Sequence, residues 1–177
     1  MQIISGIYKN KPLKAPDAPG THPMGSREKL ALFNMLMPYL SDATVLDAFS
    51  GTGALGLEAL SRGASSVTLV EKSPKAARII KENLATVGND SRAKLLVTDV
   101  KNLGSAYDLA ENFDLIIADP PYDHFEPALI ESLVPLLKKS GILALSHPGL
   151  SPKLAGLKLL KSHTYAAATI SIYCVAK

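Results

Sequence analysis

The sequence has little of what disulfide and metal chemistry require. It contains one cysteine, Cys174, so the chain cannot form a disulfide within itself. This cysteine lies in an alternating C-terminal run, which indicates a small apolar strand residue. The four histidines (His22, His124, His147 and His163) are widely scattered. Their spacing fits no metal-binding motif, and we expect no bound metal.

Long apolar runs and phosphate-binding signatures are also missing. No stretch approaches the roughly 18 apolar residues of a membrane helix, and no signal-peptide pattern opens the chain. We therefore expect a cytoplasmic protein that makes no membrane contact. We also expect it to be a monomer. The pattern Gly-x-x-x-x-Gly-Lys is absent, which argues against a P-loop nucleotidase.

What remains is the composition of an ordinary folded domain. The chain has 177 residues, of which 47% are hydrophobic and 20% are charged. This is enough apolar material for one core, and it excludes a disordered or purely acidic protein. The net charge of +3 permits a nucleic-acid partner without requiring one.

Strand-like and helix-like segments alternate from residue 43 onward, which predicts a mostly parallel α/β sheet that ends in an antiparallel hairpin. The expected strands are Thr44–Asp47, Ser66–Val70, Ala93–Val97, Phe113–Ala118, Ile142–Ser146, Leu157–Ser162 and Ala168–Ala176. The expected helices are Ser26–Tyr39, Gly53–Arg62, Pro74–Val87, Leu103–Ala110 and Glu126–Lys139. We predict an N-terminal extension over residues 1–42 and a second domain over residues 43–177.

The extension begins with a pattern typical of a small basic β-hairpin. Residues 2–8 alternate loosely and reach the turn-like segment 9–11, and the chain could return through Leu13. Lys9, Lys11 and Lys14 lie near the expected turn and return strand. Such a hairpin is either a solvated surface feature or a contact for nucleic-acid phosphates.

The tetrapeptide Asp119-Pro120-Pro121-Tyr122 directly follows the apolar run Phe113–Ala118, which predicts a buried parallel strand. In an open α/β sheet, ligands bind just past the carboxyl ends of the strands. The two prolines restrict the turn and leave its carbonyls free to accept hydrogen bonds. A carboxylate beside an aromatic ring on such a turn suits the binding of a planar amine.

A glycine-rich loop joins the first strand of the sheet to the helix that follows. Gly51, Gly53 and Gly56 form the pattern Gly-x-Gly-x-x-Gly in a strand–turn–helix context. Glu71 ends the next strand, near the spacing expected for an acid that binds ribose hydroxyls. Together these features indicate a cofactor that contains a nucleoside, either a nicotinamide dinucleotide or S-adenosylmethionine.

Two further acids favour the second of these cofactors. Asp47 ends the first strand, where a carboxylate would oppose a pyrophosphate but suit an ammonium group. Asp99 follows the third strand and could accept a hydrogen bond from an adenine amine. With Glu71, the acids create an electronegative cleft, which suits the cationic S-adenosylmethionine.

The segments 46–64, 70–71, 113–116 and 119–122 together resemble the RsmD-type family of bacterial methyltransferases. The resemblance covers nearly the whole chain, including residues 3–6 near its start and Arg27 in the first helix. It implies a Rossmann-like class I methyltransferase fold with a seven-stranded sheet, preceded by an N-terminal hairpin and helix. It also implies methyl transfer from S-adenosylmethionine, with S-adenosylhomocysteine as product, to the exocyclic N2 of a guanine in small-subunit ribosomal RNA.

The resemblance further implies which residues act. The residues expected to bind the cofactor are Asp47, Phe49, Gly51, Gly53, Glu71, Lys72, Asp99, Val100 and Asp119. The residues expected to act on the target amine are Asp119, Pro120 and Tyr122, with the tyrosine ring stacked on the base. The residues expected to contact RNA, or the assembled small subunit, are Lys9, Lys11, Lys14, Arg27 and Pro121.

The chain departs from the family pattern at two places. It has His22-Pro23-Met24 where the family usually has Arg-Pro-Thr, and Ser146-His147 where the family often has an acid. Two alternatives therefore stay open. One is an amino-methyltransferase that acts on adenine or on a protein amide, and the other is an RNA-binding protein of the same fold without catalysis.

Overall fold

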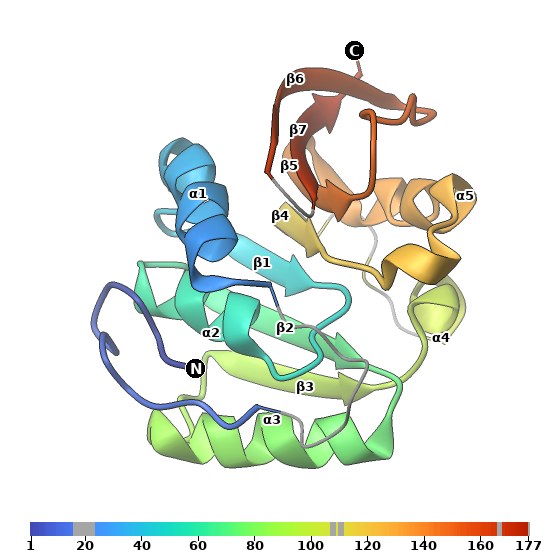
Figure 1. Ribbon diagram of the computed structural model, residues 1–177. Coiled ribbons are helices and arrows are strands. Elements are labelled where there is room, and N and C mark those ends of the chain that lie inside the picture. Colours follow the sequence, from blue (N-terminus) through green and yellow to red (C-terminus); the bar gives the residue numbers. More distant parts are fainter. Residues whose placement is uncertain (16–23, 107–108, 110–111, 166–167, 177) are drawn as a thin grey trace.

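A seven-stranded sheet forms the centre of the computed structural model, which describes residues 1–15, 24–106, 109, 112–165 and 168–176 (Figure 1). The strands are β1 (Thr44–Asp47), β2 (Ser66–Glu71), β3 (Ala93–Val97), β4 (Phe113–Ala118), β5 (Leu137–His147), β6 (Leu157–Thr164) and β7 (Thr169–Val175). Their order is β3-β2-β1-β4-β5-β7-β6. β1 to β5 pair in parallel, whereas β7 is antiparallel to both β5 and β6. The predicted sheet and its C-terminal antiparallel hairpin are confirmed.

Helices cover both faces of this sheet. The α-helices are α1 (Ser26–Leu36), α2 (Ala54–Ser61), α3 (Pro74–Thr86), α4 (Leu103–Ala106) and α5 (Pro127–Glu131). The 3-10 helices are η1 (Met37–Tyr39), η2 (Val100–Asn102), η3 (Tyr122–His124) and η4 (Val134–Leu136). Side chains of β4 point alternately to two apolar cores, with Leu115 facing α1 to α3 and Ile116 facing α4 and α5. This is why the strand reads as a continuous apolar run.

The prediction of one helix over Glu126–Lys139 is wrong. The helix α5 ends at Glu131, η4 follows, and β5 already begins at Leu137. Pro135 lacks a backbone N–H and cannot continue an α-helix, so the chain tightens into η4. The residues after it join the sheet instead, because Leu137 pairs with Phe113 of β4.

The expected N-terminal hairpin is present as a loop closed by one antiparallel bridge, between Gln2 and Pro12, rather than by two regular strands. Gly6 has a left-handed backbone with φ of 86°, which bends the first half of the hairpin. The backbone N–H groups of Ile4 and Ser5 donate to the Glu58 carboxylate of α2, at 2.7 and 3.0 Å. The hairpin is therefore attached to the helix that follows the glycine loop.

Candidate active site at the carboxyl edge of the sheet

The strand order changes direction at the pair formed by β1 and β4. Here β2 and β3 extend the sheet to one side and β5, β7 and β6 extend it to the other. Asp47 ends β1 and lies opposite Ile117 of β4, two positions before Asp119. Ligands of open α/β sheets bind at such a reversal of strand order, so two carboxylates border the expected binding crevice.

The glycine loop between β1 and α2 has the backbone shape that its glycines permit. Gly51 and Gly53 adopt left-handed conformations, with φ of 54° and 78°. A Cβ atom at Gly51 would have no atom within 4 Å, so the space beside the loop is open to a ligand. Gly56 serves packing instead, because a Cβ there would lie 2.3 Å from a methyl group of Leu69.

Asp47 is completely buried behind this loop. Its Oδ2 accepts a hydrogen bond from the Gly56 N–H at 2.9 Å, whereas Oδ1 has no partner among the described residues. Burial raises the pKa of Asp47 to about 7, and the negative charges of Asp119 and Glu71 add to this effect. A buried carboxylate oxygen without a donor matches the need of a cationic ligand group.

Glu71, at the end of β2, closes the loop from the neighbouring strand. Its two carboxylate oxygens accept the backbone N–H groups of Gly51, at 2.9 Å, and Ser73, at 2.7 Å. Each oxygen keeps capacity for another donor, such as a ribose hydroxyl. One strand further along, the Asp99 carboxylate accepts the Lys101 N–H at 3.0 Å, and the exposed Lys72 ammonium lies 4.0 Å from it.

On the other side of the reversal, Asp119 follows β4 and contacts a small polar cluster. The Tyr122 hydroxyl donates to Asp119 at 3.5 Å and shares a short hydrogen bond with Ser146, near the end of β5. Burial raises the pKa of Asp119, whereas hydrogen bonds from Ser146 and Tyr122 oppose the shift. Burial also raises the pKa of Tyr122 to about 12, with further contributions from Asp119 and Glu28. The phenol is therefore a neutral donor at physiological pH.

The structure places the remaining expected site residues at different depths. Phe49 is partly buried against the core beneath α4 and α5, and Val100 is buried in it. In the turn after Asp119, Pro120 is buried and Pro121 is exposed. The polar side chains at this edge are therefore mainly the strand-end acids and Tyr122.

The expected RNA contacts do not lie together. Tyr8 donates to Asp90 at 2.5 Å, just before β3 begins, so the adjacent Lys9 lies toward the amino edge of the sheet, away from the glycine loop. Lys14 pairs with Glu82 at 2.6 Å. Arg27, in contrast, is an exposed residue in the first turn of α1.

Of the departures from the family pattern, His22 and Pro23 lie outside the described residues, whereas Met24 packs against the core beneath α1. Ser146 is buried and holds the Tyr122 hydroxyl, as described above.

Sequence reasoning missed two residues that hold the glycine loop. The Ser50 hydroxyl donates to the Asp47 carbonyl at 2.8 Å and accepts the Val70 N–H at 2.9 Å. The Asn83 amide of α3 donates to the Thr52 carbonyl at 2.8 Å. Asn83 is completely buried, and a polar residue on the apolar stripe of a helix was the signal that could have found it.

Neither a cluster of metal ligands nor a membrane-spanning helix is found in the part of the chain that the structure describes. No cluster of three or more His, Cys, Asp or Glu side chains there could hold a metal ion. No described helix combines the length and apolar character needed to cross a bilayer.

Comparison with known proteins identifies the family. A family model described as conserved hypothetical protein 95 matches residues 1–174. The chain belongs to this family. The chain is also similar to the ribosomal RNA small subunit methyltransferase D of Escherichia coli, with 36% identity over 81% of this chain and 70% of that protein. The resemblance to the RsmD-type family is thereby confirmed.

Two further relatives match nearly the full length. YlbH of Bacillus subtilis, provisionally named an rRNA methyltransferase, is 31% identical over 98% of both chains. A solved Escherichia coli structure, provisionally named the methyltransferase yhhF, has a TM-score of 0.86 and 28% identity, covering 99% of this chain and 97% of that one. The chain thus has the fold of a methyltransferase family, and the acids described above lie at the carboxyl edge of its sheet.

Proposed function

We propose that this protein transfers a methyl group from S-adenosylmethionine to the exocyclic N2 of a guanine in small-subunit ribosomal RNA. The relatives named as ribosomal RNA methyltransferases support the substrate class. The observation that carries the chemistry is the pair of carboxylates, Asp47 and Asp119, on either side of the strand reversal. Asp47 lies behind the glycine loop, and Asp119 lies between the end of β4 and Pro120.

The glycine-loop side fits the cofactor. The unpartnered Oδ1 of Asp47 would accept a hydrogen bond from the ammonium group, and Glu71 would bind ribose hydroxyls. Asp99 lies at the third strand end, where it could accept from the adenine amine. S-adenosylmethionine, when bound, supplies an electrophilic methyl group on a sulfonium leaving group. What the protein adds is mainly position.

The Asp119 side fits the acceptor. A guanine N2 amine is a weak nucleophile because its lone pair is delocalised into the ring. Its two N–H bonds could donate to the Asp119 carboxylate and the Pro120 carbonyl, which would direct the nitrogen lone pair outward. The raised pKa of Asp119 also makes it a better acceptor for the proton that the amine loses after methyl transfer.

Tyr122 would hold the flipped base by stacking. In the structure its hydroxyl contacts both Asp119, at 3.5 Å, and Ser146. The contact with Asp119 is long and can be given up when the amine binds, while Ser146 keeps the ring in place. The serine thus replaces the acid that the family often carries near this position, and it supplies a hydroxyl without adding negative charge.

The decisive experiment supplies labelled S-adenosylmethionine and undermethylated small ribosomal subunits and maps the labelled nucleotide. The expected product carries one methyl group on a guanine N2. Label on an adenine or on a ribosomal protein would contradict the proposed acceptor. Absence of S-adenosylmethionine binding by calorimetry would contradict methyl transfer altogether and leave an RNA-binding protein without catalysis.

A further inference from the structure

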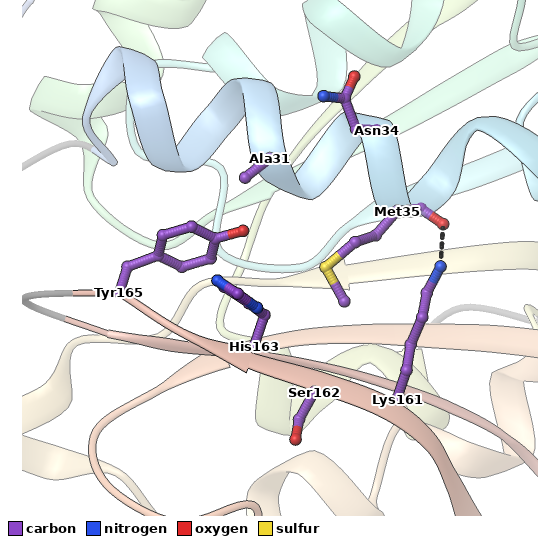
Figure 2. Close-up of a pocket in the computed structure, with 7 residues that line it drawn as sticks. All are labelled: Ala31, Asn34, Met35, Lys161, Ser162, His163 and Tyr165. Atoms are coloured by element: carbon purple, nitrogen blue, oxygen red, sulfur yellow. Dashed lines mark hydrogen bonds between the residues drawn. The ribbon is translucent and has the colours of Figure 1, made fainter.

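A groove with a volume of about 380 Å³ lies between α1 and β6, outside the site described above. The residues that line this α1–β6 groove are Ala31, Asn34, Met35, Lys161, Ser162, His163 and Tyr165. In Figure 2, the side chains of Lys161, His163 and Tyr165 extend from the C-terminal hairpin, formed by β6 and β7, toward α1. The Met35 side chain extends from α1 toward them. The volume lies in the range of pockets that bind small organic groups.

The groove combines two features that bind nucleotides. His163 and Tyr165 form a tilted aromatic pair, with ring centroids 4.6 Å apart and ring planes at 52°, so a base could stack on one of the two rings. The Lys161 ammonium donates to the Met35 carbonyl at 3.1 Å, which holds it at the groove and leaves its other protons for a phosphate. No carboxylate lines the groove among the described residues, so nothing there opposes an anion.

Arg27 extends this positive character along α1. Residues four positions apart share one face of a helix, so Arg27 lies on the same stripe as Ala31 and Met35. Arg27 is exposed, and it is one turn nearer to the start of α1 than Ala31. The stripe therefore runs from the groove toward the first turn of the helix.

The groove reaches the edge of the sheet that carries the candidate acceptor site. On the sheet side, Thr164 pairs with Thr169, and Thr169 pairs with His147, the residue after Ser146. The groove thus opens at the same edge of the sheet as Asp119 and Tyr122.

We propose that the α1–β6 groove binds single-stranded RNA next to the target nucleotide, with an unpaired base on the His163–Tyr165 pair and a phosphate at Lys161. This inference rests on the proposed function and adds a location for the RNA. It moves the expected RNA path from the N-terminal hairpin to α1 and the C-terminal hairpin. An unpaired strand is the fitting partner, because stacking on side chains requires bases that are free of a duplex.

The test measures the affinity of a fluorescein-labelled single-stranded RNA oligonucleotide for Lys161→Glu and for a matched control, Lys158→Glu. Lys158 lies on the same strand but does not line the groove. We expect Lys161→Glu to weaken binding about tenfold and to reduce its salt dependence, whereas Lys158→Glu changes affinity less than about twofold. Equal losses would overturn the proposal, because they would indicate a general effect of charge.

A second variant tests stacking. Tyr165→Leu keeps apolar contact with the core beneath α1 but removes the ring. We expect about tenfold weaker RNA binding, with S-adenosylmethionine affinity and thermal stability within error of wild type. Unchanged RNA affinity would overturn the proposal.

The substrate assay separates this inference from the proposed function. If wild-type protein methylates ribosomal RNA while Lys161→Glu and Tyr165→Leu both bind and methylate normally, the groove proposal is wrong and the proposed function stands. If wild type methylates no ribosomal RNA, the proposed function itself fails. If these two groove variants lose activity on assembled subunits but bind free RNA normally, the occupant is a ribosomal protein and the RNA proposal is overturned.

Discussion

Asp47 and Asp119 follow neighbouring strands of one sheet, yet their carboxylates are held in different ways. Asp47 is completely buried and accepts a backbone N–H from Gly56, which belongs to a helix packed tightly on the sheet. Asp119 is partly exposed and is contacted by the side chain of Tyr122. Backbone donors are fixed by the fold, whereas a side chain can exchange one partner for another. The first arrangement suits a resident cofactor, and the second suits a substrate that enters and leaves.

Removal of Asp119 should have the largest effect on activity. Asp119→Ala removes the carboxylate that would accept a hydrogen bond and a proton from the target amine. We therefore expect turnover to fall by about 10²- to 10⁴-fold, with S-adenosylmethionine affinity retained. Single-turnover methyl transfer and calorimetry measure the two quantities. Asp119→Asn is the control for shape, and turnover near the wild-type value in Asp119→Ala would remove this residue from the mechanism.

Substitution of Asp47 should have the opposite result, with a loss of cofactor affinity and little change in turnover. Asp47→Asn keeps an acceptor for the Gly56 N–H but presents an N–H group where Oδ1 lacks a partner. Loss of a charged hydrogen bond costs about 1.5–3 kcal/mol, so we expect S-adenosylmethionine affinity to fall by about one to two orders of magnitude. Turnover at saturating cofactor should change much less. Unchanged affinity by calorimetry would show that the ammonium binds elsewhere.

The raised pKa of Asp47 also predicts a pH dependence of stability without ligand. Its pKa is about 7 in the fold against 3.8 as a reference, so the folded state prefers the protonated acid. Its contribution is therefore most favourable below about pH 4 and is lost as the pH rises to about 7.

The check compares the free energy of unfolding at about pH 5 and about pH 8 in wild type and Asp47→Asn. The wild type should lose more stability over this interval than the variant, which lacks the titrating group. Parallel changes in both proteins would contradict the shifted pKa. S-adenosylmethionine, as a cation beside this group, should bind better as the pH rises.

Substitution of Tyr122 should have the smallest of these effects. It also tests whether the Asp119 side of the site can be changed without affecting the Asp47 side. Loss of stacking in Tyr122→Ala should weaken RNA binding about tenfold, with no change in cofactor affinity. Tyr122→Phe keeps the ring and loses only the contacts with Asp119 and Ser146, so RNA affinity should change about threefold or less. Titrations with labelled RNA and with cofactor measure both. Equal loss of both affinities in Tyr122→Ala would indicate a role in the scaffold.

The features that could be predicted from the sequence are those that local patterns determine. The apolar run Phe113–Ala118 and the glycine loop predict strand ends, and parallel strands bring their ends to one edge. Asp47, Glu71 and Asp119 could therefore be placed together without coordinates. The contact between Tyr122 and Ser146 could not, because it depends on how the turn after β4 lies against the end of β5.

The α1–β6 groove is even harder to predict from the sequence. Lys161 and Met35 are 126 positions apart, and no pattern in either segment indicates that they meet. Each residue alone is typical of a solvated strand or of a helix surface. The groove exists because β6 extends the sheet beyond β7 while α1 lies across the adjacent face.

The contacts of the Glu58 carboxylate have a consequence for the expression of part of this chain. Its carboxylate accepts from Ile4 and Ser5 and pairs with Lys29, at 3.3 Å, and with Arg62, at 2.7 Å. A cut after residue 42 would leave Arg62 as its one partner among these four. Because a buried charge that loses its partners destabilises a fold by several kcal/mol, residues 43–177 expressed alone should be aggregation-prone. The two parts expected from the sequence should then behave as one folding unit, whose first residues support the helix that follows the glycine loop.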